Sequence, residues 1–410
     1  MLNKAVQQGR SERRGEAYPC GTLSLFVKRE RRWRSCSASR QKGIGVKIEV
    51  RGLRKQFGSV PAVSDVSFQV KEGELLGLLG PSGSGKTTVL RLIAGLETPS
   101  GGDIYIDGKR VNDLSVQDRN IGFVFQHYAL FKHLTVFENI AFGLKIKKWS
   151  QPEIEQRVAE LLQLMSLDGV DQRYPHQLSG GQRQRVAIAR SLAPKPSVLL
   201  LDEPFGAVDA KVRQELREWL IRLHDRLNVT SLFVTHDQEE AMEVSGRIIV
   251  FSKGKLEQIG SPAEVYEEPA TEFVARFIGA MNIIEGRVLN GTVKIGSLEF
   301  PAPNIPDQVQ VQVGFRPYYV KVSEDPARYR QTATLRHIYF LGVAYRLEIE
   351  TAEGLILRSR MNKEEFRQYR FEVGQPVSFA VTQFRFLPQE GRSFSASAPP
   401  QQLDAGPLTP

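Results

Sequence analysis

The chain has 410 residues, 41% of them hydrophobic and 25% charged, with a formal net charge of +9. This length is too great for one compact core and predicts two or three domains. No apolar run approaches the ~20 residues that a membrane-spanning helix needs, so any role at a membrane is peripheral. Residues 1–45 hold eleven Lys and Arg against three Glu, a net charge of +8, so almost all of the excess charge lies there. Because the rest of the chain has no broad basic face, we expect no nucleic-acid partner.

The basic extension, residues 1–45, is predicted to be a disordered, solvated arm rather than a patch that binds nucleic acid. It contains both cysteines, Cys20 and Cys36, which excludes disulfides, zinc binding and thiol catalysis from the rest of the chain. Its basic, serine-containing and acid-poor composition fits an organellar transit peptide or an incorrectly assigned start of the chain. No long apolar stretch follows its charges, as a secretory signal would require.

Regular structure is predicted from Val46 onward. The stretch "ELLGLLGPSGSGKTTVLRLIAGL", residues 74–96, predicts a strand, a glycine-rich loop and a helix with one apolar face. The loop fulfils G-x-x-x-x-G-K-[ST], in which backbone N–H groups and the lysine bind phosphate oxygens and the hydroxyl after the lysine binds Mg²⁺. We therefore predict a site for nucleotide phosphates at Gly80, Pro81, Ser82, Gly83, Ser84, Gly85, Lys86, Thr87 and Thr88.

Four polar residues follow other apolar stretches. Gln126 follows "IGFVF", Asp202 and Glu203 end "SVLLLDE", and His236 follows "TSLFVT". Strands separated by helical segments predict a parallel α/β sheet, which binds its ligands at the carboxyl ends of the strands. We expect Thr87, Asp202 and Gln126 to bind Mg²⁺, Glu203 to orient or deprotonate the attacking water, and His236 to contact the γ-phosphate.

The stretch "QLSGGQRQRVAIAR", residues 177–190, predicts a second helix with glycines at its N-terminus. It lies in a predicted helical subdomain, about residues 127–196, which includes another helix within residues 153–170. One nucleotide has no room for two complete phosphate cradles. The simplest arrangement is a two-fold dimer in which Ser179, Gly180, Gly181 and Gln182 of one copy contact the ATP held by the other.

The pattern of apolar and polar residues changes after residue 280. Short alternating stretches such as "VQVQVGFRPYYVKV", separated by Pro and Gly turns, predict a small all-β domain of barrel or sandwich type over residues 281–390. Residues 391–410 have few bulky apolar side chains and are predicted to be a disordered tail.

Residues 46–280 resemble the ATP-binding subunits of ABC transporters, because they contain that family's ordered motifs: Gly80–Thr88, Gln126, Leu178–Gln182, Asp202 with Glu203, and His236. The resemblance implies an α/β P-loop NTPase domain with a helical subdomain, an OB/TOBE-like all-β domain after it, and ATP and Mg²⁺ as cofactors. It also implies that Asp209, which ends "GAVD", contacts the partner's ATP and that Phe57 stacks on adenine. A place in the hydrophobic core is an equal alternative for Phe57.

Longer stretches, among them "FVTHDQEEAMEVS" and "EPATEFVARFIGAMNIIEG", look like the import ATPases for sulfate and thiosulfate. This resemblance implies ATP hydrolysis at a head-to-tail dimer that drives import. The implied partners are a second copy of the chain, two membrane-spanning permease subunits and, indirectly, a sulfate-binding protein. The implied location is the cytoplasmic face of a bacterial plasma membrane, with the stromal side of the chloroplast envelope as the alternative. Nothing in the chain is expected to touch sulfate, so an importer of sugar, molybdate or polyamine stays open.

In these importers the segment after Gln126 receives a short helix of the membrane subunit, and Tyr128, Phe131 and Phe137 fit either that anchor or the hydrophobic core. Two departures stand out: "GAVD" has valine where leucine is usual, and "RPYY" has Tyr318 where the importers have an acid after Arg316 and Pro317. The tyrosine puts in doubt any regulatory or dimer contact made by that acid.

Two other function classes fit the sequence less well. A soluble ABC ATPase that acts on nucleic acid or ribosomes would need a long coiled-coil insertion or two motif sets, and this chain has one set and no long heptad region. A small-molecule kinase or GTPase would lack the signature at residues 178–182. A GTPase would also carry Asn-Lys-x-Asp, and "NKEE" at residues 362–365 lacks the aspartate.

Overall fold

The computed structural model describes residues 45–206, 208–387 and 401–402. The predicted disordered arm at residues 1–45 and the predicted tail at residues 391–410 therefore lie outside the described residues, apart from Gly45 and residues 401–402. Val46 and the residues after it belong to one unit, and the account below concerns this unit alone.

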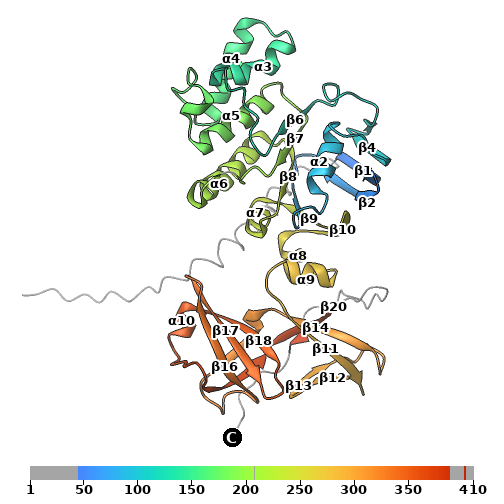
Figure 1. Cartoon of the computed structure of the whole chain (residues 1–410), viewed down its shortest axis with the longest axis vertical. Coiled ribbons are helices and arrows are strands. Elements are labelled where there is room, and N and C mark those ends of the chain that lie inside the picture. Colours follow the sequence, from blue (N-terminus) through green and yellow to red (C-terminus); the bar gives the residue numbers. More distant parts are fainter. Residues whose placement is uncertain (1–44, 207, 388–400, 403–410) are drawn as a thin grey trace, which may run out of the picture. The chain divides into compact units, whose positions relative to one another are not determined.

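The first sheet is antiparallel, with the strand order β2-β1-β4-β5 (Figure 1). Its long strands, β1 (Val46–Phe57) and β2 (Val60–Lys71), form a hairpin, and β4 (Gly101–Ile106) and the short β5 (Lys109–Arg110) continue the sheet. Buried and exposed residues alternate along the second half of β2, as expected for a sheet with one covered face.

The second sheet has the order β10-β9-β3-β8-β7-β6 and confirms the predicted parallel α/β fold. Its strands are β3 (Leu75–Leu79), β6 (Ile121–Val124), β7 (Val198–Asp202), β8 (Thr230–Thr235), β9 (Arg247–Ser252) and β10 (Lys255–Gly260). All neighbouring pairs are parallel except β9 and β10, which are antiparallel. Every residue of β3, β7 and β8 is buried. This explains the nearly continuous apolar sequences of β3 and β7, whereas β8 also buries Thr230, Ser231 and Thr235.

Hydrophobic cores cover both faces of this parallel sheet. Alternate residues of β7 show the division: Val198 and Leu200 join the core shared with α2 (Lys86–Ala94) and the antiparallel sheet, whereas Leu199 and Leu201 join the core shared with the other helices. These helices are α3 (Val136–Ile146), α4 (Gln151–Leu164), α5 (Gly180–Leu192) and α6 (Ala210–Leu227). The shorter α7 (Gln238–Val244) follows β8. The sheet is thus buried by different elements on its two sides.

The helices begin where their sequences provide caps. Thr135, Ser150 and Ser179 are the N-caps of α3, α4 and α5, and each forms a reciprocal capping box with the residue three positions later. The helix predicted within residues 153–170 is α4, which ends earlier than that range, at Leu164. The chain turns there because Ser166 and Gly169 adopt positive φ angles of 52° and 72°, which interrupt a right-handed helix.

The short helices α8 (Pro262–Glu267) and α9 (Glu272–Phe277) precede the all-β part of the chain, which confirms the predicted change of fold class. One of its sheets runs β13-β12-β11-β14-β20-β21 and the other β15-β19-β16-β17-β18. The strands in chain order are β11 (Asn282–Leu289), β12 (Thr292–Ile295), β13 (Leu298–Pro301), β14 (Gln310–Phe315), β15 (Val320–Ser323), β16 (Gln331–Phe340), β17 (Ala344–Thr351), β18 (Ile356–Asn362), β19 (Pro376–Val381), β20 (Gln383–Leu387) and β21 (Gln401–Gln402). Residues of both sheets share one core, and only α10 (Lys363–Phe366) and two single-turn 3₁₀ helices, Pro175–Gln177 and Pro317–Tyr319, complete the described elements.

The departure at "RPYY" has a structural consequence. Arg316 is 1% exposed; it donates to the carbonyls of Ile278, at 2.6 Å, and Tyr266, and its guanidinium lies 4.0 Å from the centre of the Tyr266 ring. The hydroxyl of Tyr318 donates to Glu267 of α8 at 2.7 Å. An acid at position 318 would face Glu267 with a like charge, so the tyrosine changes what this position contacts.

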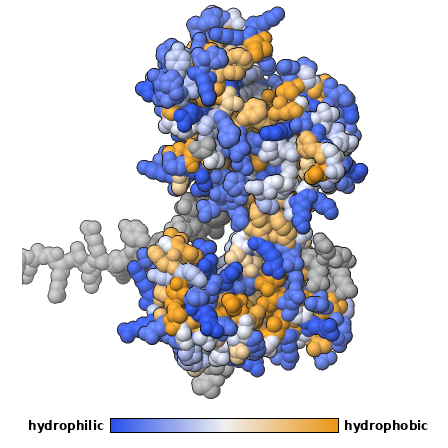
Figure 2. All heavy atoms as spheres, viewed as in Figure 1, coloured by the Kyte–Doolittle hydropathy of each residue, from blue (hydrophilic) through white to orange (hydrophobic). Residues whose placement is uncertain are grey.

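The surface of the described residues is mixed. On the face shown in Figure 2, hydrophobic residues form separate groups among hydrophilic ones. Within the described ranges, no helix combines the length and the apolar character needed to cross a membrane.

Candidate functional site

The glycine-rich loop joins β3 to α2, and two of its glycines are required by close backbone contacts. A Cβ atom at Gly80 would lie 2.3 Å from the carbonyl oxygen of Phe251, and one at Gly85 would lie 2.4 Å from that of Ala62. Gly85 also has a φ of 102°, which favours glycine. It precedes α2 without any side chain capping the helix, so the first backbone N–H groups of α2 remain available to an anion.

Lys86 is the first residue of α2, and its ammonium group is held by the loop itself. Nζ donates to the carbonyl oxygens of Gly80 and Pro81, both at 2.8 Å, and to the hydroxyl of Ser84 at 3.3 Å. Burial lowers the pKa of Lys86, and the carboxylates of Glu203 and Asp202 partly oppose that shift. The loop thus keeps a buried cation beside two acids.

Thr87 and Asp202 form the contact that links α2 to the end of β7. The Thr87 hydroxyl donates to Oδ1 of Asp202 at 2.8 Å, and Asp202 is only 3% exposed. Burial raises the pKa of Asp202, whereas the hydrogen bond from Thr87 lowers it. A hydroxyl and a carboxylate in contact are two oxygen donors of the kind that Mg²⁺ prefers.

Glu203 lies at the centre of the predicted catalytic residues. Its Oε2 accepts a hydrogen bond from Nε2 of Gln126 at 2.8 Å, and its Oε1 lies 3.2 Å from Nδ1 of His236. Its backbone has a φ of 45°, in the left-handed region that a non-glycine residue rarely adopts. The structure therefore brings Gln126, Glu203 and His236 together from three neighbouring strands.

The signature segment does not join this group. Ser179 accepts a hydrogen bond from the backbone N–H of Gln182 at 3.2 Å, and the Gln182 side chain accepts from the N–H of Ser179 at 3.0 Å. Gly181 is buried, and a Cβ there would lie 3.1 Å from Val212 of α6. Within the described residues, Ser179–Gln182 makes no hydrogen bond to the glycine-rich loop of the same chain.

Two residues implied by the resemblance lie at the ends of other elements. Asp209 is the N-cap of α6 and accepts a hydrogen bond from the N–H of Val212 at 3.0 Å. Phe57 ends β1 and is 48% exposed, with the ammonium of Lys55 4.7 Å from its ring centre. The exposed ring is not a core residue, so the alternative assignment of Phe57 to the hydrophobic core is wrong.

The aromatic residues after Gln126 divide between core and surface. Tyr128 is 7% exposed and Phe137 is partly buried against the same core, whereas Phe131 is half-buried and its ring lies 4.5 Å from that of Phe142. Larger exposed fractions belong to Phe142, at 38%, and Ile146, at 63%, which lie one turn apart on α3. The spacing of four residues between Phe142 and Ile146 in the sequence places them on the same face of a helix, and it could have identified this exposed apolar face.

Arg190 of α5 is a residue that the sequence prediction missed. Its guanidinium donates to the carbonyls of Tyr128 and Ala129 at 2.9 and 2.8 Å, and both of those residues have positive φ. Burial lowers the pKa of Arg190. The only available signal was an arginine following the apolar run "VAIA", which does not reveal the carbonyls it holds.

The donor set fits Mg²⁺ bound together with phosphates rather than a metal site made by protein alone. In the described part of the chain, no three His, Cys, Asp or Glu side chains are grouped so that they could hold a metal ion. Mg²⁺ typically uses one or two protein oxygens and completes its shell with water and substrate phosphates. Thr87 and Asp202 provide such a partial set.

The chain matches two family models: one described as "ABC transporter" over residues 63–206 and the TOBE domain over residues 306–383. It is 49% identical over 361 residues to the sulfate/thiosulfate import ATP-binding protein CysA of Nitrosomonas europaea, covering 85% of this chain and 99% of that protein. It is 50% identical over 349 residues to the protein of the same name in Synechococcus elongatus, covering 85% and 98%. Among solved structures, cbiO1 of Clostridium perfringens, part of the ABC transporter complex cbiONQ, has 30% sequence identity and a TM-score of 0.51 over 54% of this chain and 90% of that one.

The loop geometry predicts different outcomes for two glycines. Gly83→Ala should cost only the strain of a side chain at positive φ, about 1 kcal/mol, because nothing lies within 4 Å of its added Cβ. Gly85→Ala adds a clash with the backbone of Ala62 and should lower the apparent melting temperature several degrees further. Thermal unfolding of both variants at one scan rate measures the difference. Equal melting temperatures would contradict the close approach at Gly85.

Proposed function

Because the chain belongs to the ATP-binding subunits of ABC transporters, and among them to the sulfate/thiosulfate import ATP-binding proteins, we propose that it hydrolyses ATP to drive sulfate and thiosulfate import through separate membrane subunits. We choose this substrate because about half of the aligned residues are identical along almost the full length of these relatives. ATP hydrolysis as the reaction is supported by the grouping of Lys86, Thr87 with Asp202, and Glu203.

In the proposed reaction, the uncapped N-terminus of α2 and Lys86 bind the β- and γ-phosphates of ATP. The carbonyl oxygens that now hold Nζ are weaker partners than charged phosphate oxygens, so Lys86 exchanges them when phosphate binds. Thr87 and Asp202, with Gln126, would hold Mg²⁺, which neutralises charge on these phosphates. The exposed ring of Phe57 is available to stack on adenine.

Glu203 is the proposed general base. It takes a proton from a water molecule as the water oxygen forms a bond to the γ-phosphorus and the bond to the bridging oxygen of ADP breaks. Gln126 holds one carboxylate oxygen at 2.8 Å and His236 lies 3.2 Å from the other, which fixes the direction of the carboxylate. His236 is half exposed, so its ring is also accessible to the γ-phosphate.

The signature segment supports a dimer. Ser179–Gln182 forms a glycine-containing helix N-terminus, a structure suited to phosphate, yet it makes no hydrogen bond to the loop of its own chain among the described residues. We propose that Ser179, Gly180, Gly181, Gln182 and Asp209 contact the ATP bound by a second copy. Hydrolysis would then remove the shared γ-phosphate and open the pair.

The remaining proposed partners follow from import. The exposed face of α3 contains Phe142 and Ile146 and lies next to the partly buried Phe131. We propose this face as the surface that contacts the permease, which has two subunits. A sulfate-binding protein is an indirect partner, because it would deliver the anion to the permease. We propose the cytoplasmic face of a bacterial plasma membrane as the location, with the stromal side of a chloroplast envelope as the alternative.

Uptake of radiolabelled sulfate tests the substrate. Cells that lack this chain should lose uptake, and the full chain should restore it, with thiosulfate competing and molybdate, maltose and spermidine having no effect. The Glu203→Gln variant should not restore uptake. If sulfate uptake is unchanged without the chain, the proposed substrate is wrong and an importer of one of the other solutes takes its place.

Glu203→Gln should retain ATP and lower the rate of hydrolysis roughly 100-fold or more, because the amide cannot accept the proton. The ATP-bound Glu203→Gln variant should elute as a dimer in size-exclusion chromatography coupled to light scattering. Glu239→Gln, an exposed acid in the first turn of α7, is the control and should behave as wild type. A monomeric Glu203→Gln protein with normal turnover would refute the assignment of the base.

Ser179→Arg should abolish hydrolysis but leave ATP binding by the isolated subunit largely intact, because the residue serves the opposite copy. The substitution also removes the cap of α5, which costs about 1 kcal/mol. Ser261→Arg removes a cap of the same kind from α8, where the Ser261 hydroxyl accepts from the N–H of Glu264 at 3.2 Å, and is the matched control, which should keep hydrolysis. Fluorescent-nucleotide titration and phosphate release separate the two readouts. Loss of binding in the monomer would argue that Ser179 acts within its own chain.

A further inference from the structure

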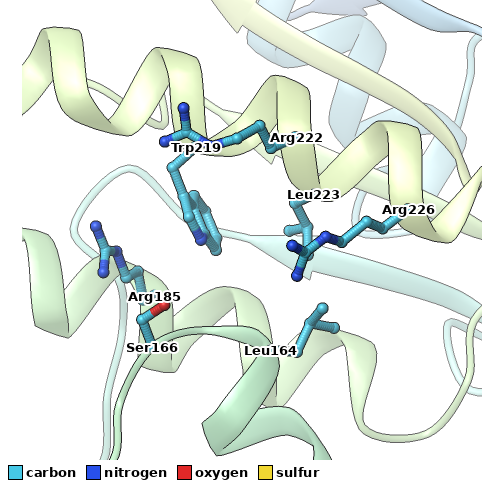
Figure 3. A pocket seen from close by; sticks show the side chains of 7 residues that line it. All are labelled: Leu164, Ser166, Arg185, Trp219, Arg222, Leu223 and Arg226. Carbon is cyan, nitrogen blue, oxygen red and sulfur yellow. The ribbon is translucent and has the colours of Figure 1, made fainter.

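A pocket of about 190 Å³ lies between α6 and the segments at the end of α4 and in α5, and none of its residues belongs to the site above. Figure 3 shows Trp219 and Leu223 extending from α6 toward Leu164 and Ser166, with Arg185 on one side and Arg226 on the other. The volume lies below the roughly 300–1,000 Å³ of pockets for drug-sized ligands, so it suits only a ligand smaller than these.

The sequence of α6 produces one wall of this pocket. Trp219, Arg222, Leu223 and Arg226 have the spacing i, i+3, i+4 and i+7, which places them on one helix face. Trp219 and Leu223 are 7% and 4% exposed and form an apolar floor, whereas Arg222 and Arg226 are exposed. The face is therefore apolar at its base and cationic at its rim.

Arg185 of α5 adds a third guanidinium from the opposite wall. It lies 5.4 Å from the Trp219 ring centre, donates to the carbonyl of Met165 at 3.4 Å, and has a buried Nε without a hydrogen-bond partner. Burial lowers its pKa, Glu215 partly opposes the shift, and Arg222 adds to it. The guanidinium is thus held near a like charge in partly desolvated surroundings.

Of the three arginines that line the pocket, one has a carboxylate partner. Arg222 pairs with Glu218 at 3.4 Å, but among the residues that the structure describes neither Arg185 nor Arg226 forms an ion pair within 4.0 Å. Arg226 is also in the last turn of α6, where a cation stabilises the helix dipole. That explanation does not extend to Arg185, which lies in the second turn of α5.

We propose that this pocket binds a small organic anion that carries a sulfate or phosphate ester on an apolar or aromatic body. Arg185 and Arg226 bind the ester oxygens from two sides, because planar guanidinium groups match tetrahedral oxyanions. Trp219, Leu223 and Leu164 contact the apolar body. The Ser166 hydroxyl is available as a further donor.

Binding there bridges the two helices that begin at residues proposed to contact the ATP of the second copy. α5 begins after Ser179 and α6 begins after Asp209, and an anion between Arg185 and Arg226 joins the two helices. A bound anion should therefore restrain their relative movement and slow ATP turnover. This regulatory step rests on the proposed function, whereas binding itself does not.

Isothermal titration of the full chain saturated with ATP in its Glu203→Gln form, in which the glycine-rich loop is occupied, with phenyl sulfate and phenyl phosphate tests the site, with phenol, inorganic sulfate and inorganic phosphate as comparison ligands. One or both esters should bind saturably and quench part of the tryptophan fluorescence, because Trp219 lines the pocket, and the inorganic anions and phenol should bind at least tenfold more weakly. Arg185→Gln and Arg226→Gln should each weaken ester binding roughly tenfold. Arg276→Gln, an exposed arginine of α9 paired with Glu272, should leave it unchanged.

Arg226 is exposed, so Arg226→Gln keeps the test meaningful if Arg185→Gln fails to fold. The proposal is overturned if no ester binds, or if both arginine variants bind the ester as tightly as the wild-type chain. If inorganic sulfate binds as tightly as the ester, the pocket does not recognise an organic body. The better-bound ester should lower wild-type ATP hydrolysis but not that of Arg226→Gln. If the wild-type chain hydrolyses no ATP without the ester, the proposed function is wrong. The titration still decides whether the pocket binds an ester.

Discussion

The parallel register of β6, β7 and β8 is the constraint on which the candidate catalytic site depends. Val124 pairs with Leu201, so Gln126 and Glu203 each lie two residues beyond paired positions. Asp202 pairs with Val234, which brings His236 to the other side of Glu203. A one-residue slip of either neighbouring strand would turn its polar residue away from the carboxylate. The uninterrupted parallel register of these strands therefore sets the distances of 2.8 and 3.2 Å at Glu203.

Local strain and burial make this arrangement responsive to a charged ligand. Glu203 has a left-handed backbone, which costs on the order of 1 kcal/mol, and its N–H donates to the carbonyl of Val234 at 3.1 Å. Burial lowers the pKa of Lys86 and raises that of Asp202, so burial disfavours the charge on each group. Polyphosphate and Mg²⁺ bring the opposite charges, and binding them restores favourable partners to both residues.

Sequence reasoning predicted the fold class and the segments of the glycine-rich loop because their signals are local. A continuous apolar strand, fixed glycine spacing and a following lysine are all read within about twenty residues of the chain. It did not find Arg190, because the carbonyls of Tyr128 and Ala129 lie some sixty positions away and leave no trace in side-chain pattern. For the same reason it left open whether Tyr128 lies in the core or contacts the membrane subunit, because the burial of this residue depends on the helices that cover it. Arg316 likewise reaches carbonyls on a distant segment.

Helix α5 links the two halves of the proposed dimeric mechanism. Its N-terminus carries Ser179 and Gly180, which are proposed to bind ATP of the second copy, and its last turn carries Arg190. Arg190 holds the carbonyls of Tyr128 and Ala129, two and three residues after Gln126, and Gln126 donates to Glu203. A helix transmits displacement along its axis because its backbone hydrogen bonds keep it stiff. Release of the shared phosphate would therefore act through Arg190 on the Gln126 segment, next to the exposed face of α3 proposed to contact the permease.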